Sequence, residues 1–449
     1  MNELSVLELR RKLETGDVTS RQLVEFCLDR IGDASGEGAR VFRIVDTDGA
    51  RKRADAIDAL RKNGDAPSPF AGIPISVKDL FDIEGQATLA GSRVLADAER
   101  ASKDATCIAR LRAAGFVIIG RTNMTEFAYS GLGINPHYGT PLSPYDRETG
   151  RVPGGSSSGA AVSVSDKMAA VGLGTDTGGS CRIPAAFCGT VGFKPTARRV
   201  PTDGATPLSF SLDSVGSMAQ STSCCAVIDS VISGEEDIRA EEASSAASLR
   251  IGVLRNLVLD GLDDAVATGF EGALGKLSAF GVAMEDVTIP ELDELASLNV
   301  KGGMAAAEAF AWHRRRLAER GEEYDPRIRA RIEKGSEQSA VEYIEVVLAR
   351  ERAIEAAASR TRELDAVIYP TVAIIPPTVA SVTDENDYVR INLRCLRNTN
   401  ITNFLDGCAV SLPIHDAGDP PVGLNIMGRS MQDRELFSTA AGIEKLLSR

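Results

Sequence analysis

Hydrophobic positions along the chain recur with two periods, and the two kinds of segment alternate. Apolar residues at helical spacing predict a first set of helices, at about 4–14, 20–31, 50–62, 104–114 and 160–166. Short apolar runs predict buried strands, at 73–77, 116–119 and 169–173. This alternation is typical of an α/β sheet with helices over both faces.

The second half of the chain repeats both kinds of segment after a polar, acid-rich stretch at 234–248, which we interpret as a surface loop. A strand at 251–254, a helix at 263–279 and a largely helical stretch at 303–360 follow. Later strands are expected at 366–369, 409–412 and 422–426, before a closing helix after Gln432. We expect these strands to re-enter the same sheet and the chain to form a single domain over residues 1–449.

Composition and charge narrow the range of partners. The 449 residues are 43% apolar and 25% charged, as in ordinary globular proteins, and the net charge is −13. A negative net charge argues against nucleic-acid and anionic-membrane partners. The N-terminus lacks the apolar core of a signal peptide, no run is long enough to span a membrane, and the eight cysteines are scattered. We therefore expect free thiols and a cytoplasmic protein.

Two glycine–serine loops flank an apolar segment and carry the candidate chemistry. The first reads Gly-Gly-Ser-Ser-Ser-Gly over 154–159, and the second reads Gly-Thr-Asp-Thr-Gly-Gly-Ser-Cys-Arg over 174–182. Glycines leave backbone N–H groups unobstructed, and several such groups in a turn can form an oxyanion hole. Ser180 is thus a candidate nucleophile, and the alternative is a serine that caps a short helix.

A serine nucleophile needs a base, and this chain offers a lysine. Lys78 follows the strand predicted at 73–77, between apolar residues, where burial would disfavour the ammonium and lower its pKa. The alternative is a surface lysine paired with Asp79 or Asp82.

The first loop also matches the G-x-S-x-G elbow of the α/β-hydrolases, centred on Ser157. That elbow requires a later histidine, and only His313, in a basic helical segment, and His415, in a loop, follow it. Neither setting suits a catalytic base, so we reject the interpretation of this loop as a nucleophile elbow. Three histidines without clustered cysteines also argue against a zinc site.

Together these segments resemble the amidase signature family of serine hydrolases, most densely over about 70–210. The family pattern is Gly-Gly-Ser-Ser-Gly-Gly followed by Gly-Ser-Asp-Thr-Gly-Gly-Ser-Ile-Arg, and the 24 positions between Ser156 and Ser180 match its spacing. Further segments that match are 120–128, 191–196, 369–371 and 421–429. The chain departs from the pattern at three small residues: Ser158, Thr175 and Cys181.

The resemblance implies a large mixed, twisted β-sheet covered on both faces by α-helices. It also implies a catalytic triad, in which Ser180 is the nucleophile, Ser156 is a bridging serine after a cis peptide bond, and Lys78 is the base. The oxyanion hole would consist of backbone N–H groups, those of Thr177, Gly178, Gly179 and Ser180. Asp176 and Arg182 are expected to support the loop.

We therefore expect an amidohydrolase that cleaves the C–N bond of a small or medium amide, of ureido or aryl type among others, without metal or cofactor. Substrate contacts are predicted at Tyr129, Ser130 and His137 and in a largely helical region at about 290–360. Arg394 and Arg397 would either recognise a substrate carboxylate or face solvent.

Two other functions are weighed against this one. The first is the glutaminase (A) subunit of a tRNA-dependent amidotransferase, which works with partner subunits. The second is a non-catalytic binding protein on the same fold. The oligomeric state is open, with a homodimer as one alternative.

Overall fold

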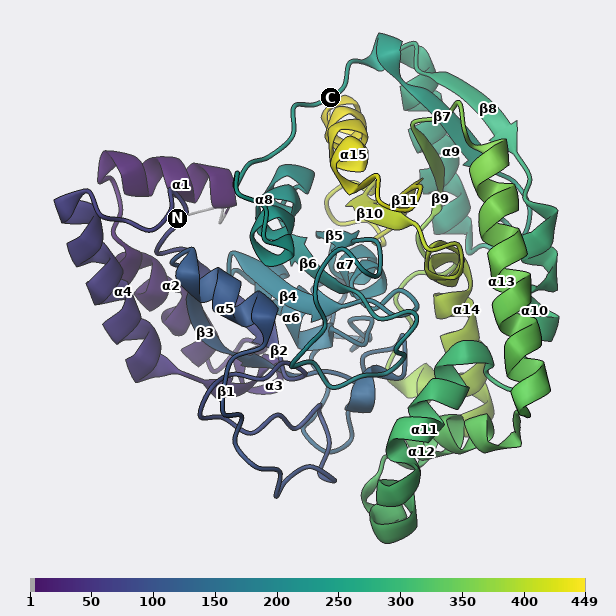
Figure 1. Ribbon diagram of the computed structural model, residues 1–449. Coiled ribbons are helices and arrows are strands. Elements are labelled where there is room, and N and C mark those ends of the chain that lie inside the picture. Colours follow the sequence, from purple (N-terminus) through teal and green to yellow (C-terminus); the bar gives the residue numbers. More distant parts are fainter. Residues whose placement is uncertain (1–4, 449) are drawn as a thin grey trace.

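A computed structural model describes residues 5–448, in which eleven strands form one sheet (Figure 1). The strands are β1 (Phe42–Val45), β2 (Pro74–Lys78), β3 (Val117–Thr122), β4 (Val171–Thr175), β5 (Val191–Lys194), β6 (Val215–Ala219), β7 (Arg250–Leu254), β8 (Ala283–Val287), β9 (Ala366–Pro370), β10 (Cys408–Pro413) and β11 (Gly423–Gly428). Their spatial order is β1-β3-β2-β4-β6-β5-β10-β11-β9-β7-β8.

The sheet is mixed, which confirms the expected fold class. Strand β2 runs parallel to β3 and β4, and β7 runs parallel to β8 and β9. The remaining neighbours, including β4 with β6 and β10 with both β5 and β11, are antiparallel. Because β10 and β11 lie between β5 and β9, the last strands of the chain join its two halves into one sheet, as predicted.

Helices cover the sheet along its length (Figure 1). Those of the first half are α1 (Val6–Thr15), α2 (Ser20–Gly32), α3 (Gly38–Val41), α4 (Thr47–Asn63), α5 (Thr106–Ala113), α6 (Ser158–Ser165), α7 (Arg182–Cys188) and α8 (Thr222–Ser233). Those of the second half are α9 (Asp264–Ala279), α10 (Leu295–Leu298), α11 (Gly303–Arg320), α12 (Pro326–Glu333), α13 (Ala340–Arg360), α14 (Glu385–Phe404) and α15 (Asp433–Leu447). The helix predicted at 4–14 begins at Val6 in the structure, and residues 1–4 lie outside the described part.

The sequence patterns missed four strands and two helices of twelve or more residues: β1, β5, β6, β8, α8 and α14. Strand β6 has the sequence Val-Gly-Ser-Met-Ala, whose small residues hide an alternating pattern although all five residues are buried. Strand β8 lies at the edge of the sheet with mostly exposed side chains, so burial imposes little pattern on it. The stretch predicted as helical at 303–360 consists of α11, α12 and α13 with short 3₁₀ turns between them.

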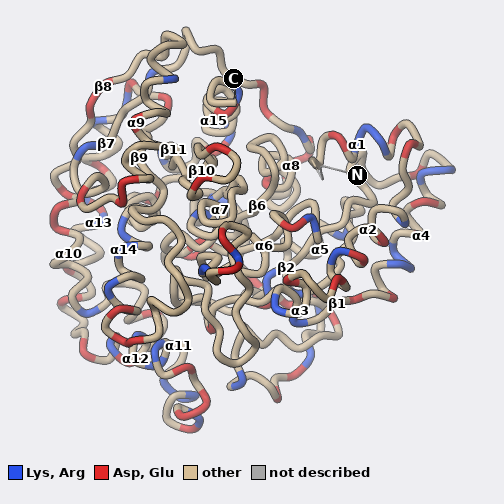
Figure 2. The backbone as a smooth tube through the Cα atoms, turned by 180° about the vertical axis from the view of Figure 1, so that it is seen from behind, with Lys and Arg blue, Asp and Glu red and all other residues tan. Residues whose placement is uncertain are grey.

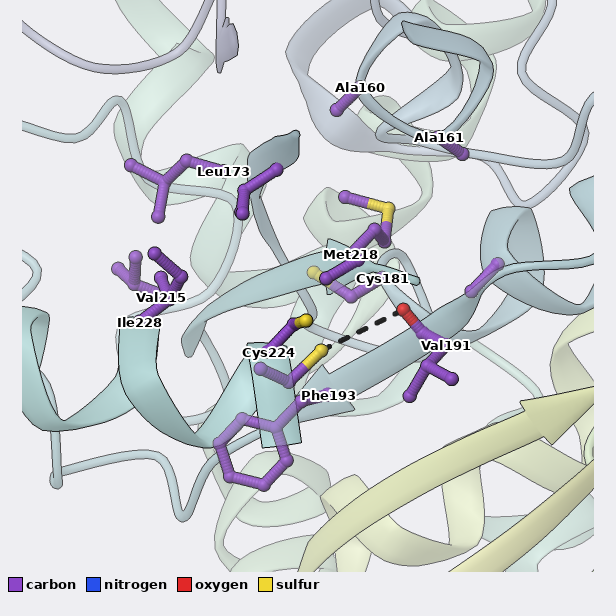
Figure 3. Close-up of a cluster of buried hydrophobic side chains, with 14 of the residues drawn as sticks. Ala160, Ala161, Leu173, Cys181, Val191, Phe193, Val215, Met218, Cys224 and Ile228 are labelled. Atoms are coloured by element: carbon purple, nitrogen blue, oxygen red, sulfur yellow. Dashed lines mark hydrogen bonds between the residues drawn. The ribbon is translucent and has the colours of Figure 1, made fainter. Parts of the chain in front are cut away.

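The core behind the two serine loops is built from small and apolar residues (Figure 3). A Cβ atom added to Gly172 on β4 would lie 2.6 Å from the carbonyl oxygen of Ala160, so α6 packs directly onto the strand. Cys224 and Ile228 of α8 belong to the same buried cluster. All eight cysteines are free and buried, as expected.

Charged residues of both signs alternate along the outer helices, for example along α1, α2 and α4 (Figure 2). Within residues 5–448, no helix combines the length and the apolar character that crossing a bilayer would require.

Candidate active site

The candidate site lies where the parallel strands β2 and β4 end side by side. Val77 of β2 is paired with Leu173 of β4, so the residues that follow them meet at one edge of the sheet. Lys78 is the last residue of β2 and Thr175 is the last residue of β4. In open α/β sheets, ligands bind at this carboxyl edge of the strands.

Lys78 is fully buried and faces hydroxyl groups. Its Nζ lies 2.8 Å from Ser156 Oγ and 2.8 Å from Thr175 Oγ1. Burial lowers the pKa of Lys78 to about 8, although the negative charge of Asp213 and Asp176 opposes that shift. The Lys78 amine therefore loses its proton at a pH much closer to 7 than the amine of a lysine in water does.

The alternative of a surface lysine paired with an acid is wrong. Asp79 binds two arginines instead, with Oδ1 2.7 Å from Arg121 Nε and Oδ2 3.2 Å from Arg43 Nε. Asp82 accepts a hydrogen bond from Thr88 Oγ1 at 2.7 Å.

Ser156 lies in the first serine loop, immediately before α6. The Gly155–Ser156 peptide bond is cis, as the resemblance implies. The Ser156 carbonyl accepts a hydrogen bond from the Thr125 N–H at 3.1 Å, and the next N–H, that of Ser157, donates to the carbonyl of Ser180 at 3.3 Å. The two serine loops are thus joined by main-chain contacts, and Ser158 is compatible with its position because its φ is not positive.

Ser180 ends a tight turn just before α7, and its side chain is almost fully buried. Within residues 5–448, no hydrogen bond occupies the N–H groups of Thr177, Gly178 and Ser180. The Gly179 N–H, by contrast, donates to Asp176 Oδ1 at 2.8 Å. The Gly179 N–H is therefore engaged inside the loop in this structure, and its contribution to the oxyanion hole stays a prediction.

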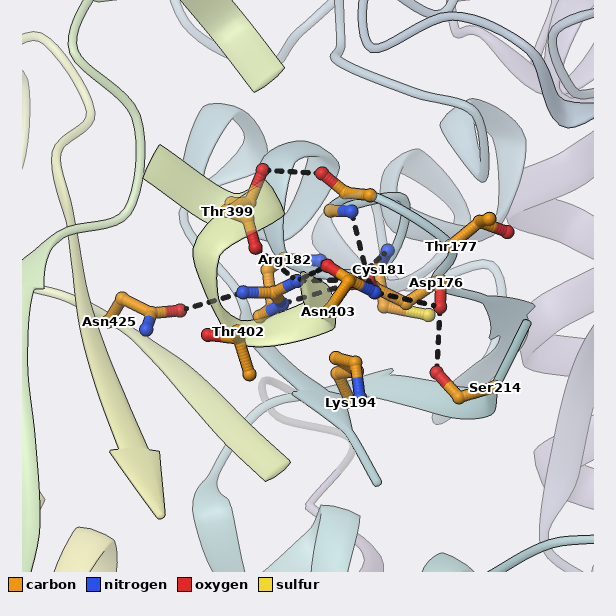
Figure 4. A network of polar contacts seen from close by, with 12 residues as sticks. Asp176, Thr177, Cys181, Arg182, Lys194, Ser214, Thr399, Thr402, Asn403 and Asn425 are labelled. Carbon is orange, nitrogen blue, oxygen red and sulfur yellow. Dashed lines mark hydrogen bonds and ion pairs between the residues drawn. The ribbon is translucent and has the colours of Figure 1, made fainter. Parts of the chain in front are cut away.

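Asp176 and Arg182 form the buried framework of this turn (Figure 4). Arg182 Nε and Nη2 each lie 3.0 Å from an oxygen of Asp176, and both side chains are fully buried. Burial alone would raise the pKa of Asp176, but the charge and hydrogen bonds of Arg182 lower it to about 2. The pair is therefore ionised and holds the turn, as expected for supporting residues.

Helix α14 closes the turn from the opposite side (Figure 4). Thr399 Oγ1 donates to the Gly178 carbonyl at 2.7 Å, and Asn403 Oδ1 accepts from Arg182 Nη2 at 2.6 Å. Gly179 has a φ of +133°, and a Cβ atom there would lie 2.2 Å from Thr399 Oγ1. Glycine is required at this position by both conformation and space.

A second carboxylate, that of Asp213, supports the turn from the segment before β6. Its Oδ1 accepts a hydrogen bond from Thr177 Oγ1 at 2.5 Å, and its Oδ2 accepts one from the Leu208 N–H at 2.9 Å. Burial raises the pKa of Asp213 to about 6 in spite of these hydrogen bonds.

The predicted substrate contacts have different surroundings. Ser130 is engaged within the protein, since its Oγ accepts from the Tyr388 hydroxyl at 2.7 Å and lies 3.0 Å from Asn392 Oδ1. His137 Nε2 lies 2.9 Å from the buried carboxylate of Glu126. The Tyr129 hydroxyl has no hydrogen-bond partner among residues 5–448, and the ring is covered by the guanidinium of Arg331.

The other charged residues that the sequence offered as candidates bind other parts of the protein. Arg394 binds Asp263 Oδ1 at 2.9 Å, and Arg397 donates to the carbonyl of Asp260 at 2.6 Å, so both tie α14 to one loop.

The rejected elbow remains without a base, because His313 Nδ1 lies 3.0 Å from the Tyr324 hydroxyl and His415 Nδ1 lies 3.3 Å from the Val422 nitrogen. Cys181 is fully buried, which raises the pKa of its thiol and agrees with our interpretation that it is not a nucleophile. Within the described residues, no cluster of three or more potential ligands could hold a metal ion.

Comparisons with known proteins show the family to which the chain is similar. The model of the Amidase family matches residues 22–437. The 2-amino-5-chloromuconic acid deaminase of Comamonas testosteroni is 34% identical over 99% of this chain and 96% of that protein. The A subunit of the glutamyl-tRNA(Gln) amidotransferase from Symbiobacterium thermophilum is 31% identical over 99% of this chain and 96% of its own length. A crystal structure of an amidase superimposes with a TM-score of 0.88 at 29% identity, over 98% of this chain and 99% of the other.

The chain belongs to the amidase family, whose members act on amide C–N bonds.

Proposed function

We propose that this protein is an amidohydrolase acting on linear amides other than peptide bonds, with Ser180 as nucleophile, Ser156 as proton relay and Lys78 as base. The observation that carries the proposal is the 2.8 Å contact between the buried Lys78 amine and Ser156 Oγ. A fully buried amine with a lowered pKa and hydroxyl partners is suited to accept a proton, because its neutral form is accessible near physiological pH.

The reaction begins when neutral Lys78 accepts the proton of Ser156, which accepts the proton of Ser180. Ser180 Oγ then forms a bond to the amide carbon, and the carbonyl electron pair moves onto oxygen. The unoccupied N–H groups of Thr177, Gly178 and Ser180 would stabilise this oxyanion, each donor by roughly 3–4 kcal/mol.

The same relay operates in reverse to release the amine. Protonated Lys78 returns its proton through Ser156 to the leaving nitrogen, which departs as ammonia or an amine when the C–N bond breaks. Water then attacks the acyl-Ser180 ester with the relay again accepting a proton, and the carboxylate is released. Release of ammonia takes support from the similarity to a protein named as a deaminase.

Hydrolysis of a panel of primary, aryl and ureido amides, followed by ammonia detection, tests this proposal. Labelling with a fluorophosphonate should mark Ser180, and Ser180→Ala should lose both labelling and hydrolysis. Ser180→Ala protein that hydrolyses amides at the normal rate would refute the assignment.

The similarity to amidotransferase subunits supports a second candidate function, glutamine hydrolysis within a complex. Co-purification with partner subunits, and activity on glutamine that depends on them, would favour this function. Hydrolysis of other amides by the isolated chain would count against it.

A further inference from the structure

Two carboxylates hold the loop at 208–213 beside the turn at 176–180, here called the nucleophile turn. They are Asp213 at the end of the loop and Glu308 of α11, and neither forms a salt bridge among residues 5–448. The partly buried Asp213 accepts hydrogen bonds from neutral donors alone: the Thr177 hydroxyl and two N–H groups of the loop. A carboxylate withdrawn from water without a cation is costly, so its presence here points to a use for the charge.

Glu308 fixes the middle of the loop to α11. Its Oε2 accepts hydrogen bonds from Ser209 Oγ at 2.6 Å and from the Ser211 N–H at 3.0 Å. Its Oε1 accepts from the Ser211 hydroxyl and from the Tyr343 hydroxyl, each at 2.7 Å. The Asp213 carboxylate therefore has a fixed position, against which the nucleophile turn is held.

Strand pairing places Asp213 close to the base of the proposed reaction. Val215 of β6 is paired with Thr175 of β4, and Thr175 Oγ1 lies 2.8 Å from Lys78 Nζ. Asp213 precedes Val215 by two residues, and its side chain contacts Thr177, two residues beyond Thr175. The loop carboxylate and the buried amine therefore lie on either side of the same short segment.

Asp213 also differs from the other acidic groups near the amine. Burial lowers the pKa of Lys78 to about 8, and Cys181, Asp213 and Asp176 oppose this shift. Burial raises the pKa of the Cys181 thiol, which is therefore neutral, and Asp176 is paired with Arg182. The charge of Asp213 is thus the one that no cation in the described structure already balances.

Asp213 is ionised at the pH at which Lys78 exchanges its proton. Burial raises the pKa of Asp213 to about 6, the hydrogen bond from Thr177 lowers it, and the charge of Glu308, which faces Asp213 from α11, raises it. Since the pKa of Lys78 is higher, the lysine gains and loses its proton beside a carboxylate that is already charged.

We propose that Asp213 is a positioning residue of the reaction: it fixes Thr177 in the nucleophile turn and stabilises the ammonium that Lys78 becomes when it accepts the proton. This inference rests on the proposed function, since it concerns the same base and the same turn. The proton passes from Ser180 through Ser156 to Lys78, so a positive charge appears on the lysine as the oxyanion forms. A fixed carboxylate near the amine favours that charge, and the contact with Thr177 keeps its N–H group in place for the oxyanion.

The rate at which a fluorophosphonate labels Ser180, measured between about pH 6 and about pH 10, tests this proposal without a known substrate. In the wild-type protein the rate should rise to a plateau, with its inflection at the pKa of Lys78, about 8. Asp213→Asn removes the charge but keeps the shape, so the inflection should fall by roughly half a pH unit or more. The plateau rate should fall roughly 10- to 100-fold. An inflection that stays at the wild-type pH would overturn the proposal, because a merely structural carboxylate does not affect the ionisation of Lys78.

Thr177→Val and Thr177→Ser test the hydrogen bond separately from the charge. Valine lacks the hydroxyl that Asp213 binds, whereas serine keeps it. On the plateau, where Asp213 is ionised, the labelling rate should fall roughly 10-fold in Thr177→Val and less than about 3-fold in Thr177→Ser. Equal plateau rates in these two variants would overturn the proposal, and this comparison is decisive even if Asp213→Asn does not fold.

Glu308→Gln is the matched control. Glu308 also binds the loop and also lacks a cationic partner in the part of the chain that the structure describes, but its charge acts on Asp213. Its replacement should leave the inflection at the wild-type pH. A shift as large as that in Asp213→Asn would show that any charge lost near the loop has this effect, and would overturn the assignment to Asp213. Wild-type protein whose Ser180 is not labelled at all would instead refute the proposed function.

Discussion

Replacement of Thr175 by valine tests whether Lys78 works as a base. Thr175 Oγ1 and Ser156 Oγ each lie 2.8 Å from the Lys78 amine, which is fully buried. Valine has the shape of threonine but lacks the hydroxyl, so the ammonium form of Lys78 loses an acceptor while the packing is retained. The neutral form loses less, and the pKa of Lys78 should therefore fall.

The magnitude follows from the contact that is lost. A hydrogen bond to a charged group contributes about 1.5–3 kcal/mol, and one pH unit corresponds to about 1.36 kcal/mol. The pKa of Lys78, about 8 in the wild-type protein, should fall by roughly 1–2 units in Thr175→Val. Since the neutral amine is the active form, kcat/KM rises through this pKa to a plateau, and the variant should reach its plateau at lower pH.

The assay is ammonia release between about pH 5 and about pH 10, with kcat/KM plotted against pH for each protein. Ser163→Ala is the control, because its hydroxyl lies 2.7 Å from Ser76 Oγ on the same face of β2 as Lys78 but does not contact the amine. Its inflection should stay at the wild-type pH. An inflection in Thr175→Val that is unchanged, or displaced to higher pH, would refute the role of neutral Lys78.

Three further substitutions have defined outcomes. Ser156→Ala should lower kcat/KM by roughly 10²- to 10⁴-fold with an unchanged circular dichroism spectrum, because it removes the proton relay and not the packing. Gly179→Ala should lower both activity and the free energy of unfolding, the latter by roughly 2 kcal/mol or more, because the new Cβ atom meets Thr399 Oγ1 in a left-handed backbone conformation. Arg182→Met should lower the free energy of unfolding in urea by about 3–5 kcal/mol, because it leaves Asp176 buried and unpaired.

Controls for the last two changes come from exposed parts of the chain. Gly272→Ala on α9 adds a methyl group with no atom within 4 Å and should stabilise the protein slightly. Arg329→Met breaks only exposed or partly exposed ion pairs and should change the free energy of unfolding by less than about 1 kcal/mol. If the buried and exposed changes had equal effects, the framework around the turn would not be the source of its stability.

The central part of the site was accessible from the sequence because its determinants are local. Lys78 stands at the end of an apolar strand, and both serine loops combine glycines with small polar residues. The pattern around the lysine left both a buried and a surface position open, its partner Ser156 was implied only by the family resemblance, and its partner Thr175 was not predicted.

The supporting residues could not be predicted, because they come from distant segments without a pattern of their own. Thr399 is 221 positions from Gly178, whose carbonyl it binds. The contact of the Gly179 N–H with Asp176 could not be predicted for the same reason, since glycine composition does not reveal which N–H groups bind a neighbouring carboxylate.

The strand order has a consequence for biosynthesis. Strand β10, which starts at residue 408, pairs with β5 on one side and β11 on the other. A ribosome therefore completes nine strands before the strand that pairs with the free edge of β5. Until then, the unpaired backbone N–H and C=O groups along that edge can pair with other chains. Nascent chains that stall before β10 should need chaperone protection, and a separately expressed C-terminal fragment that carries β10 and β11 should rescue them.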